Sequence, residues 1–104
     1  MKQKITGALS SATNGATINT QEAGFLPGMQ VVVDMFAPAG AFSGSSKWQS
    51  SVDGSTWVDT GSTFTTTGGG FKTQTIVLAQ YLRLVTPTYT SGSVQGRILS
   101  DIGG

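Results

Sequence analysis

The chain has 104 residues, enough for one domain with a modest core and too few for two. Gly, Ser and Thr make up 42 of these residues and charged residues only 11%, so hydroxyl groups and backbone must cover most of the surface. The formal net charge of +1 gives no electrostatic reason to expect nucleic acid or an anionic membrane as a partner.

The absence of His and Cys removes most familiar site chemistry. Without them the chain has no imidazole base, no thiolate nucleophile, no disulfide and no zinc site of the Cys and His type. The N-terminal lysines, Lys2 and Lys4, are followed by polar residues rather than an apolar run, so we expect no secretion signal. Aliphatic runs such as 31–33 are far short of the roughly 20 residues that cross a bilayer.

The pattern along the chain predicts strands and turns throughout. Gly and Thr are poor helix formers, and no window repeats apolar residues at the 3.6-residue period of a helix. Strand-like stretches are separated by turn residues such as Asn14-Gly15, Pro27-Gly28 and the glycines at 68–70. We predict eight strands, at residues 3–9, 16–20, 30–36, 46–52, 56–60, 71–78, 80–87 and 93–100.

Eight short strands at this spacing are typical of an all-β domain. We therefore expect residues 1–104 to form a single-domain antiparallel β-sandwich or small jelly roll of about eight short strands. Two stretches between strands, 37–45 and 61–70, are rich in Gly, Ser and Thr and are predicted to be loops. The N-terminal residues 1–6 are either a frayed end or an arm that adds a strand to a neighbouring molecule.

The two-residue alternation of strands predicts which side chains face inward. Trp48 falls on an inward face, so we expect it in the core. Lys47, Arg83 and Arg97 fall on outward faces, and if their strands are neighbours they share one solvated surface. The simplest interpretation of these cations is that they keep an exposed face soluble. Phe42 either packs onto the core or projects as an interaction anchor.

The most specific local pattern is a hairpin around Asp53-Gly54. Gly54 tolerates a positive φ angle and Asp53 bonds to its own turn, so a tight turn between two strands is expected. One carboxylate falls short of the roughly six to eight oxygen ligands that calcium needs, which argues against a calcium loop. Trp57 either closes the hairpin against the sheet or offers a stacking platform for a sugar.

Catalytic patterns are weak. Asp53 and Asp59 are the one pair that could sit close enough for a two-carboxylate glycosidase, but Asp53 is explained by the turn and Asp59 by an exposed strand position. No Gly-x-Ser-x-Gly or Ser-x-x-Lys motif occurs. The glycines at 68–70 lack the Lys and the following helix of a phosphate-binding loop. We predict no enzymatic activity, no cofactor and no metal.

Two segments nevertheless resemble known β-sandwich proteins. The stretch 51–57, Ser-Val-Asp-Gly-Ser-Thr-Trp, is followed at 81–84 by Tyr-Leu-Arg-Leu. This pairing resembles discoidin-like extracellular modules and is similar to small β-sandwich proteins encoded beside the capsid gene of tailed bacteriophages, which act as head decoration or cement proteins. The turn also resembles the Asp-box of sialidases, a structural motif. The similarity spans 48–99 and carries no motif of high specificity.

The phage resemblance, together with the small, Cys-free, hydroxyl-rich composition, implies a structural virion protein. Its partner would be the major capsid protein, whose neighbouring subunits it would bridge on the capsid surface after synthesis in the host cytoplasm. A trimer of this chain would also cover its edge strands. The residues that we expect at such interfaces are Lys2, Lys4, Phe42, Thr63, Thr65, Arg83 and Arg97.

Two other interpretations stay open. A carbohydrate-binding module of a phage fibre or adhesin would bind glycans on a coplanar surface of exposed aromatic rings. The candidates for that surface are Trp48, Trp57, Phe42 and Tyr81. The third interpretation is an unassigned structural or assembly module.

Overall fold

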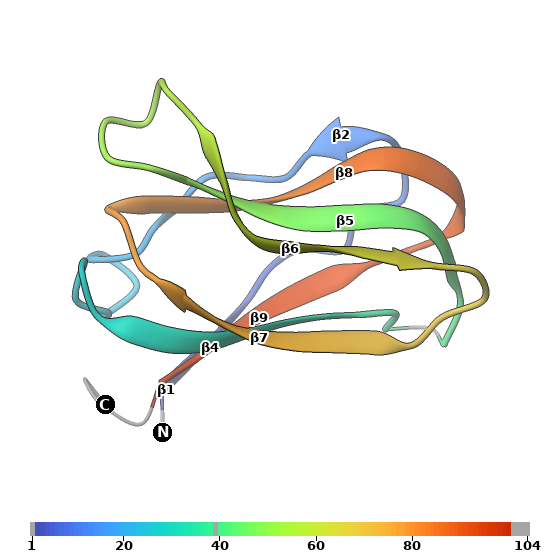
Figure 1. The fold of residues 1–104 in the computed structure, drawn as a ribbon, viewed down its shortest axis with the longest axis horizontal. Coiled ribbons are helices and arrows are strands. Elements are labelled where there is room, and N and C mark those ends of the chain that lie inside the picture. Colours follow the sequence, from blue (N-terminus) through green and yellow to red (C-terminus); the bar gives the residue numbers. More distant parts are fainter. Residues whose placement is uncertain (1, 39, 101–104) are drawn as a thin grey trace.

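Two antiparallel β-sheets packed face to face make up the fold (Figure 1). The structure is a computed structural model that describes residues 2–38 and 40–100, and these residues form no helix. The strands are β1 (Lys2–Ile5), β2 (Thr13–Asn14), β3 (Ile18–Asn19), β4 (Gln30–Phe36), β5 (Phe42–Ser51), β6 (Val58–Thr66), β7 (Phe71–Val77), β8 (Tyr81–Gly92) and β9 (Gln95–Ser100).

The strand order is that of a jelly roll. One sheet has the order β1-β9-β4-β7 and the other β2-β8-β5-β6, with β3 also paired to β8. Since β2 and β3 lie along the same strand, they act as one interrupted strand. The chain then crosses between the sheets at every connection except the β5–β6 hairpin, which is the double-sheet arrangement of a jelly roll. The predicted all-β sandwich or small jelly roll is confirmed.

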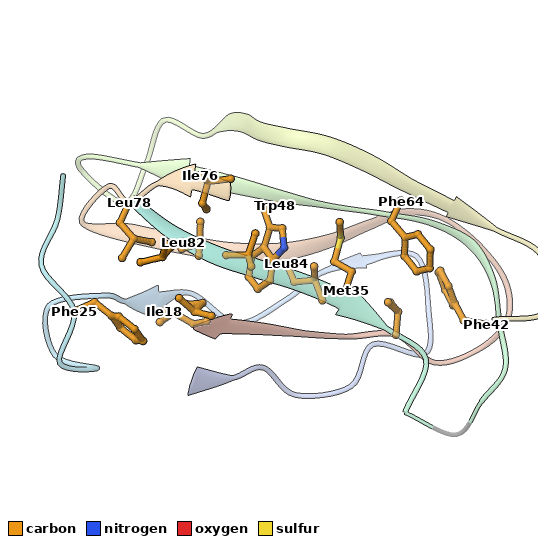
Figure 2. Packing of buried hydrophobic residues seen from close by; sticks show 14 residues of the cluster. Ile18, Phe25, Met35, Phe42, Trp48, Phe64, Ile76, Leu78, Leu82 and Leu84 are labelled. Carbon is orange, nitrogen blue, oxygen red and sulfur yellow. The ribbon is translucent and has the colours of Figure 1, made fainter. Parts of the chain in front are cut away.

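The core lies between the sheets and is centred on Trp48 (Figure 2). Trp48 is 0% exposed, as expected from the alternation in its strand. Phe25 and Ile18 fill one end of the core, and Phe42 packs near Phe64 at the other, with ring centroids 6.4 Å apart. Phe42 is therefore a core residue, and the expectation that it anchors an interface is wrong.

A glycine on the facing sheet makes room for the Trp48 indole. A Cβ atom on Gly96 of β9 would lie 2.4 Å from Cζ2 of Trp48, much closer than real atoms approach. The indole therefore lies against the backbone of the opposite sheet. Its Nε1 has no hydrogen-bond acceptor among the described residues, so packing rather than hydrogen bonding holds the ring.

A side chain bridges the two sheets at the edge formed by β6 and β7. Gln74 of β7 accepts a hydrogen bond from the backbone N–H of Ser62 on β6 at 2.6 Å and donates one to the Ser62 carbonyl at 3.2 Å. Gly61 has a φ of 76°, and a Cβ at that position would lie 2.6 Å from the Gln74 amide. The Gln74 amide thus joins the two sheets where β6 and β7 run side by side.

Several predicted boundaries are wrong. The predicted loop 61–70 is strand β6 up to Thr66, because pairing with β5 and burial of Phe64 outweigh the low strand propensity of Gly61. The predicted loop 37–45 ends where β5 begins at Phe42, and the predicted strand 16–20 shrinks to β3. In contrast, the predicted strand 30–36 coincides with β4.

The N-terminal segment is part of the chain's own sheet. Strand β1 pairs with β9, with Gln3 opposite Leu99 and Ile5 opposite Arg97. The segment proposed as an arm is therefore an edge strand that already has a partner on one side, while Met1 lies outside the described residues.

We predict that Gly96→Ala destabilises the protein. The added methyl group must push Trp48 or the β9 backbone aside, and overpacking of this kind costs about 1–3 kcal/mol. Urea unfolding should show the loss as a lower midpoint. Gly7→Ala is the matched control, because nothing lies within 4 Å of its Cβ position; equal midpoints for the two variants would contradict the tight contact.

Candidate functional site

A row of polar side chains crosses the outer face of the five-stranded sheet. Asp59 of β6 accepts hydrogen bonds from Lys47 Nζ and from Gln49 Nε2, both at 3.0 Å. Gln49 Oε1 in turn accepts two from Arg83 of β8, Nε at 3.0 Å and Nη2 at 2.8 Å. Because Gln49 is the cross-strand partner of both Asp59 and Arg83, the register itself builds this polar ladder.

The ladder ends on Trp57. The Arg83 guanidinium carbon lies 4.2 Å from the centre of the Trp57 ring, within range of a cation–π interaction. The ring is half-buried, so Trp57 closes the hairpin against the sheet through Arg83. The interpretation of its covered face as a platform for a sugar is not supported by this arrangement.

The loop between β5 and β6 is organised by Asp53. Its Oδ1 accepts hydrogen bonds from the backbone N–H groups of Ser55 at 2.8 Å and Thr56 at 2.9 Å, and from the Ser51 hydroxyl at 3.0 Å. Gly54 has a φ of 81°, which a residue with a Cβ rarely adopts. Asp53 and Gly54 thus have the predicted structural role, although the loop spans residues 52–57 and is wider than a two-residue turn.

Hydrogen bonds stabilise the charged forms of two carboxylates on this sheet. The Thr56 and Ser55 N–H groups and the Ser51 hydroxyl hold the pKa of Asp53 below its ordinary value. Gln49 and then Lys47 lower the pKa of Asp59 in the same way. Each carboxylate is therefore engaged by its own donors, which argues against the two acting together as an acid and base pair.

A hydroxyl-rich depression lies at the opposite end of the same face from the Asp53 loop. Thr63 and Thr65 are exposed on β6 because Phe64 between them points inward. Gly44 of β5 lies close against β8, since a Cβ there would lie 2.4 Å from the Thr88 carbonyl oxygen. We call this depression the hydroxyl surface; its lining residues are Ser43, Gly44, Ser45, Thr63, Thr65, Thr66, Thr67, Thr88 and Thr90.

Arg97 does not share a face with Lys47 and Arg83. It belongs to β9 in the other sheet, where its Nη2 lies 2.7 Å from Oδ2 of Asp34. The Asp34 carboxylate raises the pKa of the Arg97 guanidinium. The condition for a surface shared by all three cations, that their strands are neighbours, is therefore not met, because outward alternation fixes the face of a strand but not the sheet to which it belongs.

The remaining predicted interface residues lie apart from the hydroxyl surface. Lys4 is exposed on the edge strand β1, where it lines a cleft of about 520 Å³ with the segment 15–19 and Glu22. Lys2 is in the same strand. Of the four aromatic rings expected for glycan stacking, Trp48 and Phe42 are buried, so the coplanar platform is not formed.

Sequence reasoning missed how the hydroxyl surface is assembled. It singled out Thr63 and Thr65 but not Ser43, Ser45, Thr88 and Thr90, which reach the surface from two further strands. The alternating hydroxyl residues Thr88 and Thr90 indicate an exposed strand face. Only the strand order, in which β5 lies between β6 and β8, brings them to the same surface as Thr63 and Thr65. Among the described residues no cluster of three or more acidic, His or Cys side chains could hold a metal ion.

We predict that removing the charge from Asp53 and Asp59 flattens the acid limb of the stability curve. Their folded-state pKa values lie below the ordinary 3.8, so their contribution is complete above the unfolded-state pKa and is lost as pH falls through the folded-state pKa. Urea unfolding across this acidic range should show a smaller loss of stability for the Asp53→Asn and Asp59→Asn double variant than for the wild type. Parallel curves would contradict the assignment.

We also predict that Arg83→Ala makes Trp57 more accessible to acrylamide. The chain has two tryptophans, and Trp48 is fully buried, so quenching of the fluorescence reports mainly on Trp57. Lys47→Ala is the control, because it removes a cation of the same ladder without uncovering the ring. Equal quenching of the two variants would show that Arg83 does not cover Trp57.

Comparison with known proteins gives this surface no precedent. No family model, no curated protein and no solved structure matches the chain. The part of the chain that the structure describes contains no helix long and apolar enough to cross a membrane. The function is therefore inferred from the surfaces described above.

Proposed function

We propose that this chain is a structural virion protein that binds the outer surface of a phage capsid and stabilises it by bridging neighbouring capsid subunits. The observation that carries the proposal is the hydroxyl surface, where eight of the nine lining residues have a hydroxyl group. Its partner would be the major capsid protein. The chain would be made in the host cytoplasm and would then bind to the capsid surface.

The hydroxyl surface suits a broad protein contact. Ser and Thr hydroxyls both donate and accept hydrogen bonds, and such short side chains lose little conformational entropy when they are fixed. Protein interfaces carry about one hydrogen bond per 100–200 Å², a density that these residues can supply. Their positions are set by three paired strands, β6, β5 and β8, so little further ordering is needed on binding.

A capsid makes individually weak contacts effective. Because a capsid presents the same subunit surface many times, a protein held at one subunit meets the next at a high effective concentration. Bridging two subunits then resists their separation without a deep pocket. Jelly rolls occur in viral capsid proteins and also in lectins. The fold is therefore compatible with both a virion protein and a carbohydrate-binding module, and only the surface residues can distinguish these two functions.

The carbohydrate alternative has less support. Trp57 and Tyr81 are the two half-buried members of the expected aromatic platform, and one face of Trp57 is covered by Arg83 at 4.2 Å. Stacking on a sugar needs an open ring face. The capsid proposal instead uses a surface that is already exposed.

We predict that the purified protein co-sediments with capsids that lack it, taken from the phage that carries its gene. Replacing Thr63 and Thr65 together by Arg should weaken this binding by roughly tenfold or more, because long charged side chains cover the hydroxyl surface. Thr56→Arg is the matched control, since Thr56 is exposed at the opposite end of the same sheet.

Three results would contradict the proposal. The first is wild-type protein that stays in the supernatant, and the second is equal binding by the Thr63/Thr65 and Thr56 variants. The third is specific binding on a glycan array that is lost with Trp57→Ala, which would favour the carbohydrate module.

A further inference from the structure

The backbone of strand β1 is hydrogen-bonded on one side only. Where β1 runs on into Thr6, the Thr6 N–H donates to the Gly96 carbonyl of β9 at 2.9 Å. Because successive residues of an antiparallel strand direct their backbone groups to opposite sides, Gln3 and Ile5 turn their N–H and carbonyl groups away from β9. In the part of the chain that the structure describes, no strand pairs with that side. We call this side of β1 the open edge.

The cleft of about 520 Å³ lies between the open edge and the edge of the facing sheet. Its lining comes from both sheets and from the turn after β3: residues 4–9, 15–19, Glu22, Ala23 and Leu84. Ile18 and Leu84 are core residues, so the cleft reaches the core. At the other side of the sandwich Gln74 joins β7 to β6, whereas no hydrogen bond between described residues joins β1 to β3.

Lys4 brings a positive charge to the inner side of the open edge. Its cross-strand partner is Ile98, which is 0% exposed between the sheets, and cross-strand partners point to the same face. Lys4 accordingly lines the cleft. Its ammonium group makes no ion pair or hydrogen bond with the described residues, and Glu22 across the cleft is no exception. A strand added to this edge would therefore meet an unpaired cation beside an apolar lining.

We propose that the open edge binds an extended, acidic segment of another protein, which adds a fifth strand to this sheet beside β1. The backbone groups of Gln3 and Ile5 pair with those of the segment, as in other cases of strand addition. An acidic residue directly opposite Lys4 forms a cross-strand ion pair. The next inner side chain of the segment lies over the cleft, where burial favours an apolar residue.

The lysines of β1 disfavour a second copy of this chain at the same edge. Two antiparallel copies of β1 must oppose the residues whose backbone groups point outward, Gln3 and Ile5. The two registers with the most overlap then place Lys4 opposite Lys4 or opposite Lys2. Like charges directly opposite are destabilising, and Lys on an edge strand is a common protection against such pairing. An acidic segment instead gives the same lysines a partner.

The open edge lies apart from the hydroxyl surface. It belongs to the four-stranded sheet, whereas the hydroxyl surface is on the outer face of the other sheet. Binding at the open edge therefore does not depend on the capsid proposal. It is tested with peptides rather than with capsids, so the two proposals can fail separately.

NMR titration of the isotope-labelled protein with synthetic peptides tests the proposal. The probe peptide alternates so that Glu and Val occupy one face of its strand and Thr the other; in the control peptide Lys replaces Glu. We expect the wild type to bind the Glu peptide about fivefold or more tightly than the Lys peptide, because a cross-strand attraction becomes a repulsion. Bound Glu peptide should slow hydrogen exchange at the Gln3 and Ile5 amides.

Two variants locate the binding. Ile5→Pro removes an outward N–H but no hydrogen bond between β1 and β9, and Pro is tolerated at such edge positions. It should weaken binding of the Glu peptide by about fivefold or more. Ile5→Ala is the matched control, because it keeps the N–H and should bind like the wild type. Lys4→Glu should reverse the preference, so that the Lys peptide binds more tightly.

Circular dichroism and thermal unfolding verify that each variant is folded, and Lys4→Glu carries the test if Ile5→Pro is not. The proposal is overturned by a wild type that does not bind the Glu peptide at millimolar concentration or that binds both peptides equally. It is also overturned if neither Ile5→Pro nor Lys4→Glu changes the binding, or if the peptide slows exchange on another strand instead of at Gln3 and Ile5.

Discussion

The contact between Trp48 and Gly96 determines how the two sheets present their outer faces. Trp48 is central in one sheet and Gly96 in the other, and the indole fits only because Gly96 has no side chain. Because side chains alternate between the two faces of a strand, these two residues also fix which of their neighbours point outward. With Trp48 inward, Lys47 and Gln49 point outward and start the polar ladder; with Gly96 inward, Arg97 points outward toward Asp34.

The two outer faces are chemically distinct. The five-stranded sheet carries the polar ladder, whose side chains hydrogen-bond to one another, and the hydroxyl surface, where Thr63 and Thr65 are exposed. The outer face of the four-stranded sheet combines exposed apolar side chains, Phe71 and Val77 among them, with the ion pair of Arg97 and Asp34.

Local patterns predicted the strands well where alternation or a run of valines was clear. Strand β4 matched its predicted bounds, 30–36, and Trp48 was correctly placed in the core. Prediction failed where tertiary contacts decide: residues 64–66 of the predicted loop belong to a strand because β5 pairs with them. Likewise Arg83 and Arg97 look alike in sequence, and only the strand order separates them.

The Gln74 amide affects how strand β6 can pair with another chain. It occupies the backbone N–H and carbonyl of Ser62, the groups with which an incoming strand would otherwise pair. An open strand edge is a template for pairing with another chain, and here a single glutamine occupies the edge at Ser62 without adding a charge. The β6 edge is therefore guarded at Ser62 against the addition of a further strand, whereas β1 at the far edge of the other sheet has a partner on one side only.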